Sequence, residues 1–402
     1  MKLLTFTTLF PNSAAPNQGI FVETRLRHLV SSGEVESRVV APVPWFPSSH
    51  QAFGKYSKFA KAPAEELRSG LKVLHPRYLA IPKVGMTVSP FLLANASKAV
   101  IGRLIDEGYD FDAIDAHYFY PDGVAAVMLG KYFNKPVVIT ARGSDITLIP
   151  RYALPRQLIL WAAQNAAHLI TVCNALKTEL VNLGVQPDRI TTLRNGVDLE
   201  LFRSADRESL KSTLGFKQFT LLSVGNLVPV KGHELIIKAM PMLADVRLLL
   251  AGSGPEQRNL ENLARHLNVL DRVTFLGSVP HHELPKFYAA ADASILASSR
   301  EGWANVLLES MACGTPVVAS NVWGTPEVVA SPAAGLLMAE RSAQGVAHAV
   351  GALRTNYPDH AATRAYAEQF SWHDTTAGQI EVFLKATTSH RLGSGTSCRP
   401  AS

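Results

Sequence analysis

Short apolar runs recur along the chain, and segments with helical spacing separate many of them. The first run spans residues 2–9, and the segment after Gly19 places Ile20, Leu26 and Leu29 on one helical face. Alternation of strands and helices is typical of a mostly parallel sheet covered on both faces, so the sequence predicts an α/β fold. The further strands expected in the first half are residues 38–43, 73–79, 113–116, 137–140, 169–172 and 190–193.

The pattern pauses in a more charged stretch, residues 199–215, and then starts again. The second series of expected strands is 219–224, 246–250, 273–276, 294–296, 317–319 and 335–338. We therefore predict two doubly wound domains in tandem, residues 1–198 and 199–370. A helical end at about 371–387 and a small, polar, mobile tail at 388–402 complete the prediction.

Composition narrows the class of protein. The 402 residues exceed one ordinary core, and 47% hydrophobic with 18% charged residues exclude a disordered chain. The apolar residues after Met1 are interpreted as a buried first strand rather than a signal peptide, and no run reaches the roughly 20 residues of a membrane span. Cys173, Cys313 and Cys398 are odd in number and lack metal spacing, which favours a reducing cytoplasm without disulfides.

The net charge of +6 is concentrated in one segment. Between Trp45 and Arg103, nine lysines and arginines face two glutamates, a net charge of +7, and Phe53, Tyr56, Phe59, Tyr78 and Phe91 are interspersed. This segment is either an ordinary solvated surface or a patch for anionic lipid headgroups or a pyrophosphate-linked acceptor. No nucleic-acid-binding motif accompanies the charge, so a nucleic-acid partner is not expected.

The stretch 298–314, SSREGWANVLLESMACG, carries the most informative chemistry. Glu301 follows an expected strand at the edge where ligands collect in open α/β sheets, and a helix over 305–313 carries Glu309. Phosphates could bind the helix amino end while the carboxylates accept from hydroxyls, an arrangement suited to a nucleotide sugar.

Polar residues follow other expected strands. Lys231, after residues 219–224, suits a diphosphate, whereas the Gly-Ser-Gly at 252–254 is a weak phosphate-loop signal. In the first half the residues at strand ends are His117, Asp122, Arg142 and Asp145. For the two aspartates, capping of local backbone amides is the alternative. Asp110-Phe111-Asp112 precedes its strand, and we assign it no metal.

The ordered set GIFVE, HYFYPDG, ARGSDI, NGVD, VGN…VKG, GSGP and Glu-x7-Glu resembles the retaining glycosyltransferases of family GT4 over nearly the whole chain. The resemblance implies a GT-B fold, with two Rossmann-like domains facing each other across a cleft and a final helix that crosses back to the first domain. It also implies a nucleotide-sugar donor in the second domain, an acceptor in the first, and neither metal nor cofactor.

The resemblance further implies a role for individual residues. Glu301 would hold the transferred sugar, Glu309 the ribose, Lys231 the leaving diphosphate, and His117 would stand near the reacting carbon. The expected donor-binding set also includes Gly19, Gly225, Asn226, Gly302, Trp303, Ala304, Asn305 and Val306. The expected acceptor or phosphate contacts are Arg142, Asp145, Asp122 and Arg300.

One position departs from the family pattern. Members commonly carry arginine where this chain has Asn226, which offers a neutral amide in place of a charged fork. We expect a lighter phosphate clamp, or compensation by Arg300 or Arg142.

The segments ARGSDI and SSREGW resemble those of bacterial exopolysaccharide transferases. This resemblance implies a hexose-type sugar and a lipid-linked saccharide as acceptor. It also implies a cytoplasmic protein that is peripheral at the inner face of the cytoplasmic membrane. The alternatives are another GT-B nucleotide-sugar enzyme, such as an epimerase, and a silent carbohydrate-binding scaffold.

Overall fold

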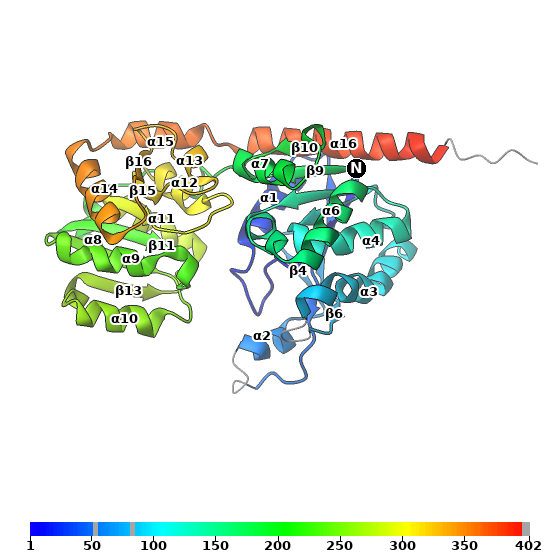
Figure 1. Cartoon of the computed structure of the whole chain (residues 1–402), viewed down its shortest axis with the longest axis horizontal. Helices are drawn as coiled ribbons and strands as arrows, with labels where there is room; N and C mark the ends of the chain where they lie inside the picture. The colour runs from blue at the N-terminus through cyan, green and yellow to red at the C-terminus, as the bar shows by residue number, and fades with distance from the viewer. Residues whose placement is uncertain (51–54, 81–84, 396–402) are drawn as a thin grey trace, which may run out of the picture. The chain divides into compact units, whose positions relative to one another are not determined.

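The chain forms two compact units. The computed structural model describes residues 1–50, 55–80 and 85–395. Unit 1 comprises Met1–Leu193 together with the chain from His373, and unit 2 comprises Arg194–Trp372 (Figure 1). We predicted the first boundary at 198/199 and the second at 370/371, so the linker-like residues after Leu193 belong to the second unit.

Unit 1 is built on a sheet whose strand order is β10-β9-β8-β7-β1-β2-β5-β4, parallel except for β4. Its strands are β1 (Lys2–Phe6), β2 (Glu36–Val40), β4 (Glu65–Arg68), β5 (Leu71–Leu74), β7 (Ala113–His117), β8 (Val137–Ala141), β9 (His168–Thr171) and β10 (Ile190–Thr192), with β3 (Val43–Pro44) and β6 (Arg77–Tyr78) forming a separate pair. The predicted run 2–9 ends at Phe6, and the run 73–79 divides into β5 and β6. The sequence analysis missed β4 because its residues, Glu-Glu-Leu-Arg, are mostly charged, as suits an edge strand.

The helices of unit 1 include the end of the chain. They are α1 (Ile20–Ser31), α2 (Lys55–Lys61), α3 (Gly85–Asp106), α4 (Val124–Phe133), α5 (Ser144–Thr147), α6 (Ala153–Asn165), α7 (Asn174–Asn182) and α16 (Trp372–Gly395). Phe383 and Ile380 of α16 are buried in one cluster with Leu26 of α1 and Leu3 of β1. The tail predicted from residue 388 is therefore wrong as far as Gly395. In that last part of α16, His390 Nε2 lies 3.1 Å from the carbonyl oxygen of Asn134.

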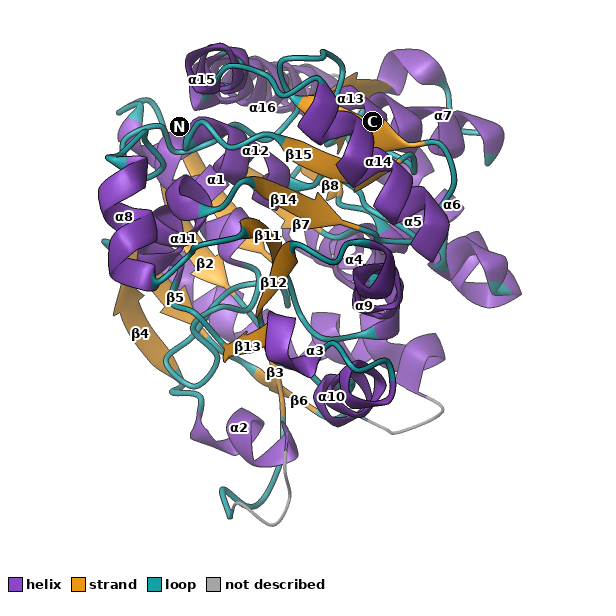
Figure 2. Ribbon diagram, turned by 90° about the vertical axis from the view of Figure 1, so that its left-hand side faces the viewer, coloured by secondary structure: helices purple, strands orange, loops and turns teal. Residues whose placement is uncertain are grey.

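Unit 2 contains a fully parallel sheet, in the order β13-β12-β11-β14-β15-β16. Its strands are β11 (Phe219–Val224), β12 (Val246–Ala251), β13 (Val273–Gly277), β14 (Ala293–Leu296), β15 (Val317–Ser320) and β16 (Gly335–Met338). Its helices are α8 (Arg207–Leu214), α9 (His233–Ala239), α10 (Gln257–His266), α11 (Leu284–Ala290), α12 (Asn305–Ala312), α13 (Thr325–Val328), α14 (Ala343–Thr355) and α15 (His360–Glu368). Helices α8 and α11 pack on one face and α9, α10 and α14 on the other (Figure 2). These strands lie where the apolar runs predict them.

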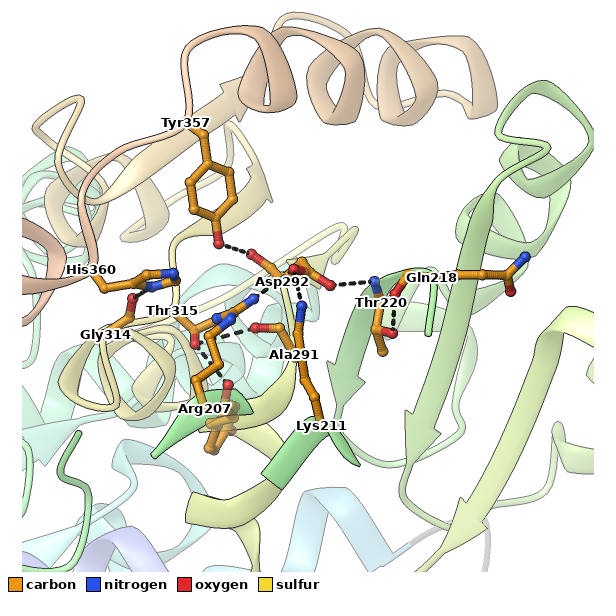
Figure 3. Close-up of polar contacts among 11 residues, drawn as sticks. Arg207, Lys211, Gln218, Thr220, Ala291, Asp292, Gly314, Thr315, Tyr357 and His360 are labelled. Carbon is orange, nitrogen blue, oxygen red and sulfur yellow. Dashed lines mark hydrogen bonds and ion pairs between the residues drawn. The ribbon is translucent and has the colours of Figure 1, made fainter. Parts of the chain in front are cut away.

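A buried carboxylate fixes α8 to the amino edge of this sheet. Asp292, just before β14, accepts hydrogen bonds from Arg207 at 2.6 Å, Lys211 at 2.7 Å and the amide of Thr220 at 2.8 Å (Figure 3). The Tyr357 hydroxyl donates to the carbonyl oxygen of Asp292 at 2.5 Å. These contacts lie at the sheet edge opposite to the strand ends that carry the predicted site, so we assign them to stability.

Within the described residues, no helix has the length and apolar character needed to cross a bilayer. Of the cysteines, Cys173 and Cys313 are buried and form no disulfide within the described residues, and Cys398 lies outside them.

Candidate functional site

Both sheets reverse their strand order at a point where the sequence places candidate residues. In unit 2 the reversal lies between β11 and β14, and Lys231 and Glu301 follow these two strands. In unit 1 it lies between β1 and β7, where Gly19 follows β1 and His117 ends β7. Open parallel sheets bind ligands at the carboxyl ends of the strands at such reversals, because the loops diverge there and leave room.

Lys231 and Glu301 form a direct ion pair in unit 2. Lys231 Nζ lies 2.7 Å from Glu301 Oε1, and Ser298 Oγ donates to the same oxygen at 2.6 Å. Only 24% of the lysine side chain and 11% of the glutamate side chain are exposed, so the pair is largely shielded from water. Lys231 keeps two further N–H donors, and Glu301 keeps Oε2, for which the described residues supply no hydrogen bond.

Glycines bring the loops of this site into contact. Gly232, next to Lys231, has φ +70°, and a Cβ there would lie 2.0 Å from the carbonyl oxygen of Ala297. A Cβ on Gly252 would lie 1.9 Å from the carbonyl oxygen of Gly225, and one on Gly254 would lie 2.3 Å from that of Leu227. The Gly-Ser-Gly sequence therefore serves close backbone packing against the loop after β11, which explains its glycines without a bound phosphate.

Asn226 lies in that loop with an exposed side chain. Its carbonyl oxygen is 3.3 Å from Nε2 of His233, whose Nδ1 is 3.2 Å from Ser223 Oγ. Burial lowers the pKa of His233 to about 4, so the ring is neutral and fastens the loop to α9. The sequence analysis missed this histidine, because a lone histidine at the start of a helix carries no functional pattern.

The amino end of α12 is partly closed by its own turn. Trp303 and Ala304 are buried, and the amide of Asn305 donates to the carbonyl oxygen of Trp303 at 3.1 Å. The Asn305 side chain accepts from Asn195 Nδ2 at 3.2 Å. The Asn305 amide is therefore already used, which leaves the amides of Trp303, Ala304 and Val306 from the set expected to face the phosphates. Arg300 is half-buried beside them.

Glu309 is held by residues that sequence analysis did not select. Its Oε1 is 3.0 Å from His281 Nε2, and its Oε2 accepts from the Tyr288 hydroxyl at 3.0 Å. Burial opposes the charged form of His281, but the hydrogen bond and charge of Glu309 outweigh it and raise the pKa of His281 overall. Glu301 and Glu309 share none of these partners, so the structure separates the two carboxylates into different polar clusters.

His117, the candidate histidine of unit 1, is buried between two charged side chains. His117 Nε2 lies 3.0 Å from Asp115 Oδ2, and Arg142 Nη2 lies 2.7 Å from His117 Nδ1. Arginine only donates, so Nδ1 accepts and Nε2 carries the proton that is donated to Asp115. Burial, assisted by the positive charges of Arg142 and Arg25 and opposed by Asp115, lowers the pKa of His117 to about 4. His117 is thus neutral with both ring nitrogens occupied.

Three predicted acceptor or phosphate contacts of unit 1 have structural roles instead. Asp145 is fully buried and accepts from the amides of Phe119 at 2.7 Å and Gly143 at 2.6 Å. Asp122, also fully buried, accepts from the amide and hydroxyl of Thr8, both at 3.0 Å. Asp145 thus caps backbone amides, among them the nearby amide of Gly143, which was the alternative interpretation, whereas Asp122 binds Thr8, a residue distant in the chain. Arg142 is 8% exposed and is directed at His117.

Gly19 has a steric reason of its own. Its φ is +67°, and a Cβ would lie 2.2 Å from the carbonyl oxygen of Leu9. The glycine thus allows the loop after β1 to fold back on the start of α1. The two aspartates set aside as a false metal motif bind cations at the opposite sheet edge, Asp110 to Lys135 and Asp112 to Arg391.

Comparisons with known proteins identify the family of the chain. A family model described as "Glycosyltransferase Family 4" matches residues 28–201, and one described as "Glycosyl transferases group 1" matches residues 206–370. The chain is 28% identical over 357 residues to a putative teichuronic acid biosynthesis glycosyltransferase, TuaC, of Bacillus subtilis, covering 87% of this chain and 88% of that protein.

Solved structures share the fold. Sucrose-phosphate synthase from Thermosynechococcus elongatus superposes with a TM-score of 0.76 at 20% identity, covering 96% of this chain and 99% of the other. HepE of Anabaena in complex with UDP-glucose gives 0.71 at 19% identity, covering 94% and 98%. Because the two family models together span residues 28–201 and 206–370, with the motifs in family order, the chain belongs to the family 4 glycosyltransferases of the GT-B fold.

Proposed function

We propose that this protein is a retaining, metal-independent hexosyltransferase that uses a nucleotide-sugar donor bound by unit 2. The Lys231–Glu301 pair at the strand reversal of unit 2 carries the proposal. A lysine that offers two unused N–H donors can bind the diphosphate, and a carboxylate with one unpaired oxygen can accept from sugar hydroxyls. Lysine and backbone amides stabilise the charge that grows on the leaving diphosphate, which is the part that a metal ion plays in other transferases.

Glu309 would accept from the ribose hydroxyls. Its oxygens each retain a second lone pair beside the bonds from His281 and Tyr288, and these bonds fix its rotamer before the donor arrives. Gly225, Gly302 and the amides of Trp303, Ala304 and Val306 would line the diphosphate. Arg300 supplies the second cation that Asn226 does not, because Arg142 is committed to His117.

The reaction breaks the bond between the anomeric carbon and the diphosphate oxygen and forms a bond to the acceptor oxygen on the same face. The proton of the acceptor hydroxyl passes to the leaving diphosphate. A double displacement would need a carboxylate nucleophile near the sugar, as in retaining glycosidases. Asp115, the carboxylate nearest to His117 in unit 1, is fully buried and binds that histidine, so it is unsuited to attack.

His117 would act through its neutral ring. Its lowered pKa means that it brings no positive charge toward the developing cationic sugar. A ring nitrogen of His117 can bind substrate only after its hydrogen bond to Asp115 or to Arg142 has been broken.

For the acceptor we propose a lipid-linked saccharide of cell-surface polysaccharide synthesis, met at the inner face of the cytoplasmic membrane. The name of the Bacillus subtilis relative supports this class of pathway. The basic segment supports it less than its net charge suggested. Arg68 pairs with Glu23 at 2.8 Å, and Lys72 pairs with Glu65 at 3.1 Å and Glu107 at 3.9 Å.

Two of those carboxylates lie outside residues 45–103, so counting charges within the segment overstated the free positive charge. Phe53 and Lys83, and the side chains of Lys55, Tyr56 and Lys58, lie outside the described residues. Flotation with anionic vesicles tests the membrane partner directly, and loss of the protein from the vesicle fraction would count against it.

A thermal-shift screen of nucleotide sugars, followed by NMR of the product anomer, tests the transfer. We expect one donor to stabilise the protein, slow hydrolysis of that donor, and a product with the anomeric configuration of the donor. Glu301→Ala should abolish hydrolysis. An inverted product would overturn the retaining mechanism, and a stabilising donor that is never hydrolysed would favour the carbohydrate-binding scaffold.

A further inference from the structure

Unit 1 contains a cavity of about 390 Å³ that none of the assigned residues uses. It lies beyond the carboxyl ends of β1 and β2, on the edge of the sheet that faces ligands in this fold. Its apolar lining includes Phe10, Pro42, Val43, Pro44, Phe59 and Tyr78. None of the described residues that line it carries a charged side chain, and its volume falls within the roughly 300–1,000 Å³ of small-molecule sites.

Part of the polar lining of this cavity is already bonded to the protein. The Thr8 hydroxyl donates to Asp122, and Gln18 Nε2 donates to the carbonyl oxygen of Thr8 at 3.1 Å. Asn12 Oδ1 accepts from the amides of Ala14 and Ala15, both at 3.0 Å. Asn12 Nδ2, Gln18 Oε1 and the Tyr78 hydroxyl are the side-chain groups of the lining for which the described residues supply no hydrogen bond. A sugar ring buries more hydroxyls than these three groups can pair, whereas a hydrocarbon chain needs no polar partner.

A short sheet and a helix hold the cavity in shape. Strands β3 and β6 pair, and the amide of Trp45 donates to the carbonyl oxygen of Tyr78 at 2.7 Å. The Arg77 guanidinium donates to the carbonyl oxygens of Phe59 and Ala62, which ties α2 to β6. Burial, assisted by the charge of Asp122, raises the pKa of Tyr78 to about 12, so its phenol brings no negative charge.

The residues that directly follow the lining positions of these two strands are apolar and exposed. Trp45 directly follows the lining residue Pro44 and is 53% exposed, and Leu79 directly follows Tyr78 and is 54% exposed. The β3–β6 pairing places these two exposed side chains on neighbouring strands. Exposed apolar side chains therefore stand next in the chain to two of the residues that line the cavity.

We propose that this cavity and its rim, Trp45 and Leu79, bind the hydrocarbon chain of the acceptor, with the chain entering past the rim. The proposal rests on the lipid-linked acceptor proposed above and adds the site that selects it. Burial of apolar surface favours binding, and each further buried methylene should strengthen binding roughly fourfold. Selection by the chain would let unit 1 recognise the lipid carrier while the carried saccharide varies.

Calorimetry below the critical micelle concentration tests this without transfer chemistry. The probes are decyl maltoside for a saturated chain, farnesyl phosphate for a prenyl chain, and maltose for a headgroup alone. We expect both chain probes to bind and maltose not to bind. Preference for one chain identifies the type of lipid. Maltose binding as tightly as decyl maltoside would overturn the proposal in favour of a sugar site.

Two variants of the full chain locate the binding. The double variant Trp45→Ser with Leu79→Ser removes the two exposed apolar side chains, and we expect its affinity for the hydrocarbon probes to fall at least tenfold. The control is Tyr152→Ser with Leu154→Ser, which removes side chains 51% and 44% exposed elsewhere in unit 1 and should leave affinity unchanged. Ala62→Leu fills the cavity and should also weaken binding. Equal affinities for the rim and control variants would overturn the assignment.

Donor hydrolysis separates this inference from the proposed function. If the donor is hydrolysed but the hydrocarbon probes do not bind, the cavity assignment is overturned and the proposed transferase function is unaffected. If the hydrocarbon probes bind but the donor is not hydrolysed, the cavity assignment is supported and the result counts against the proposed transferase function.

Discussion

Gly232→Ala should damage the donor site through a single backbone contact. The glycine has φ +70°, follows Lys231, and would place a Cβ 2.0 Å from the carbonyl oxygen of Ala297. Real Cβ contacts essentially never fall below 3.0 Å, so the loops carrying Lys231 and Glu301 must separate by about 1 Å. Ser299 bonds Val230 by its amide at 2.8 Å across the same gap, and this bond would stretch with them.

Two terms contribute to the cost. An alanine in the left-handed region costs roughly 1–2 kcal/mol, and forcing a methyl group against packed atoms costs roughly 1–3 kcal/mol more. Displacing a binding group by 1 Å lowers turnover about 100-fold. We therefore expect Gly232→Ala to lose about 3–4 kcal/mol of unfolding free energy and about 100-fold in kcat/KM.

Gly215→Ala is the matched control. Gly215 lies in the same unit with φ +69°, and a Cβ there meets nothing within 4 Å. It should lose only the conformational term and keep its activity. Urea denaturation of both variants measures the loss of stability. The rate of nucleotide release from the donor identified in the thermal-shift screen measures the loss of activity. If the variants match in stability and in activity, the contact with Ala297 does not position the site and the reasoning fails.

Three further predictions concern charge. Lys231→Ala should reduce transfer about 1,000-fold, whereas Asn226→Ala, which removes an exposed neutral amide, should cost less than tenfold in the same kinetic assay; equal losses would contradict the lighter clamp. Asp292→Asn should lower the unfolding free energy by about 3 kcal/mol, because Arg207 and Lys211 lose their shared carboxylate, and a loss under 1 kcal/mol in urea denaturation would remove its structural role. The folded-state pKa of His117, about 4, lies below the ordinary value of 6.5, so stability should fall as the pH drops from 6.5 to 4, and His117→Gln should remove about 3 kcal/mol of that dependence. An unchanged pH profile of unfolding in His117→Gln would refute the buried neutral ring.

The strands of unit 2 could be predicted because a fully buried parallel strand must be apolar throughout. The runs 219–224 and 335–338 match β11 and β16 to the residue. Strand β4 could not be predicted, since an edge strand needs few apolar residues and Glu65–Arg68 has only Leu67. Apolar runs also overstate strand length, and the run 2–9 continues past Phe6 into a loop whose Phe10 is buried.

Some residues of the candidate site could be predicted from the sequence, and others could not. Glu301 and Lys231 could be placed near each other because both follow strands at the reversal of the sheet. The partners of Glu309 could not, because His281 and Tyr288 come from a turn and a helix whose approach to α12 depends on tertiary packing. Asp122 and Asp145 occupy the expected edge, but only the three-dimensional structure shows that their oxygens bind backbone amides and, for Asp122, also the Thr8 hydroxyl.

The Lys231–Glu301 pair has a consequence for product release. Glu301 supplies the lysine with a counterion of its own. A departing diphosphate thus leaves behind a cation that finds its counterion at 2.7 Å, so the empty site is not a bare positive charge. If Lys231 binds the diphosphate as proposed, this pairing would weaken retention of the spent nucleotide and so limit product inhibition.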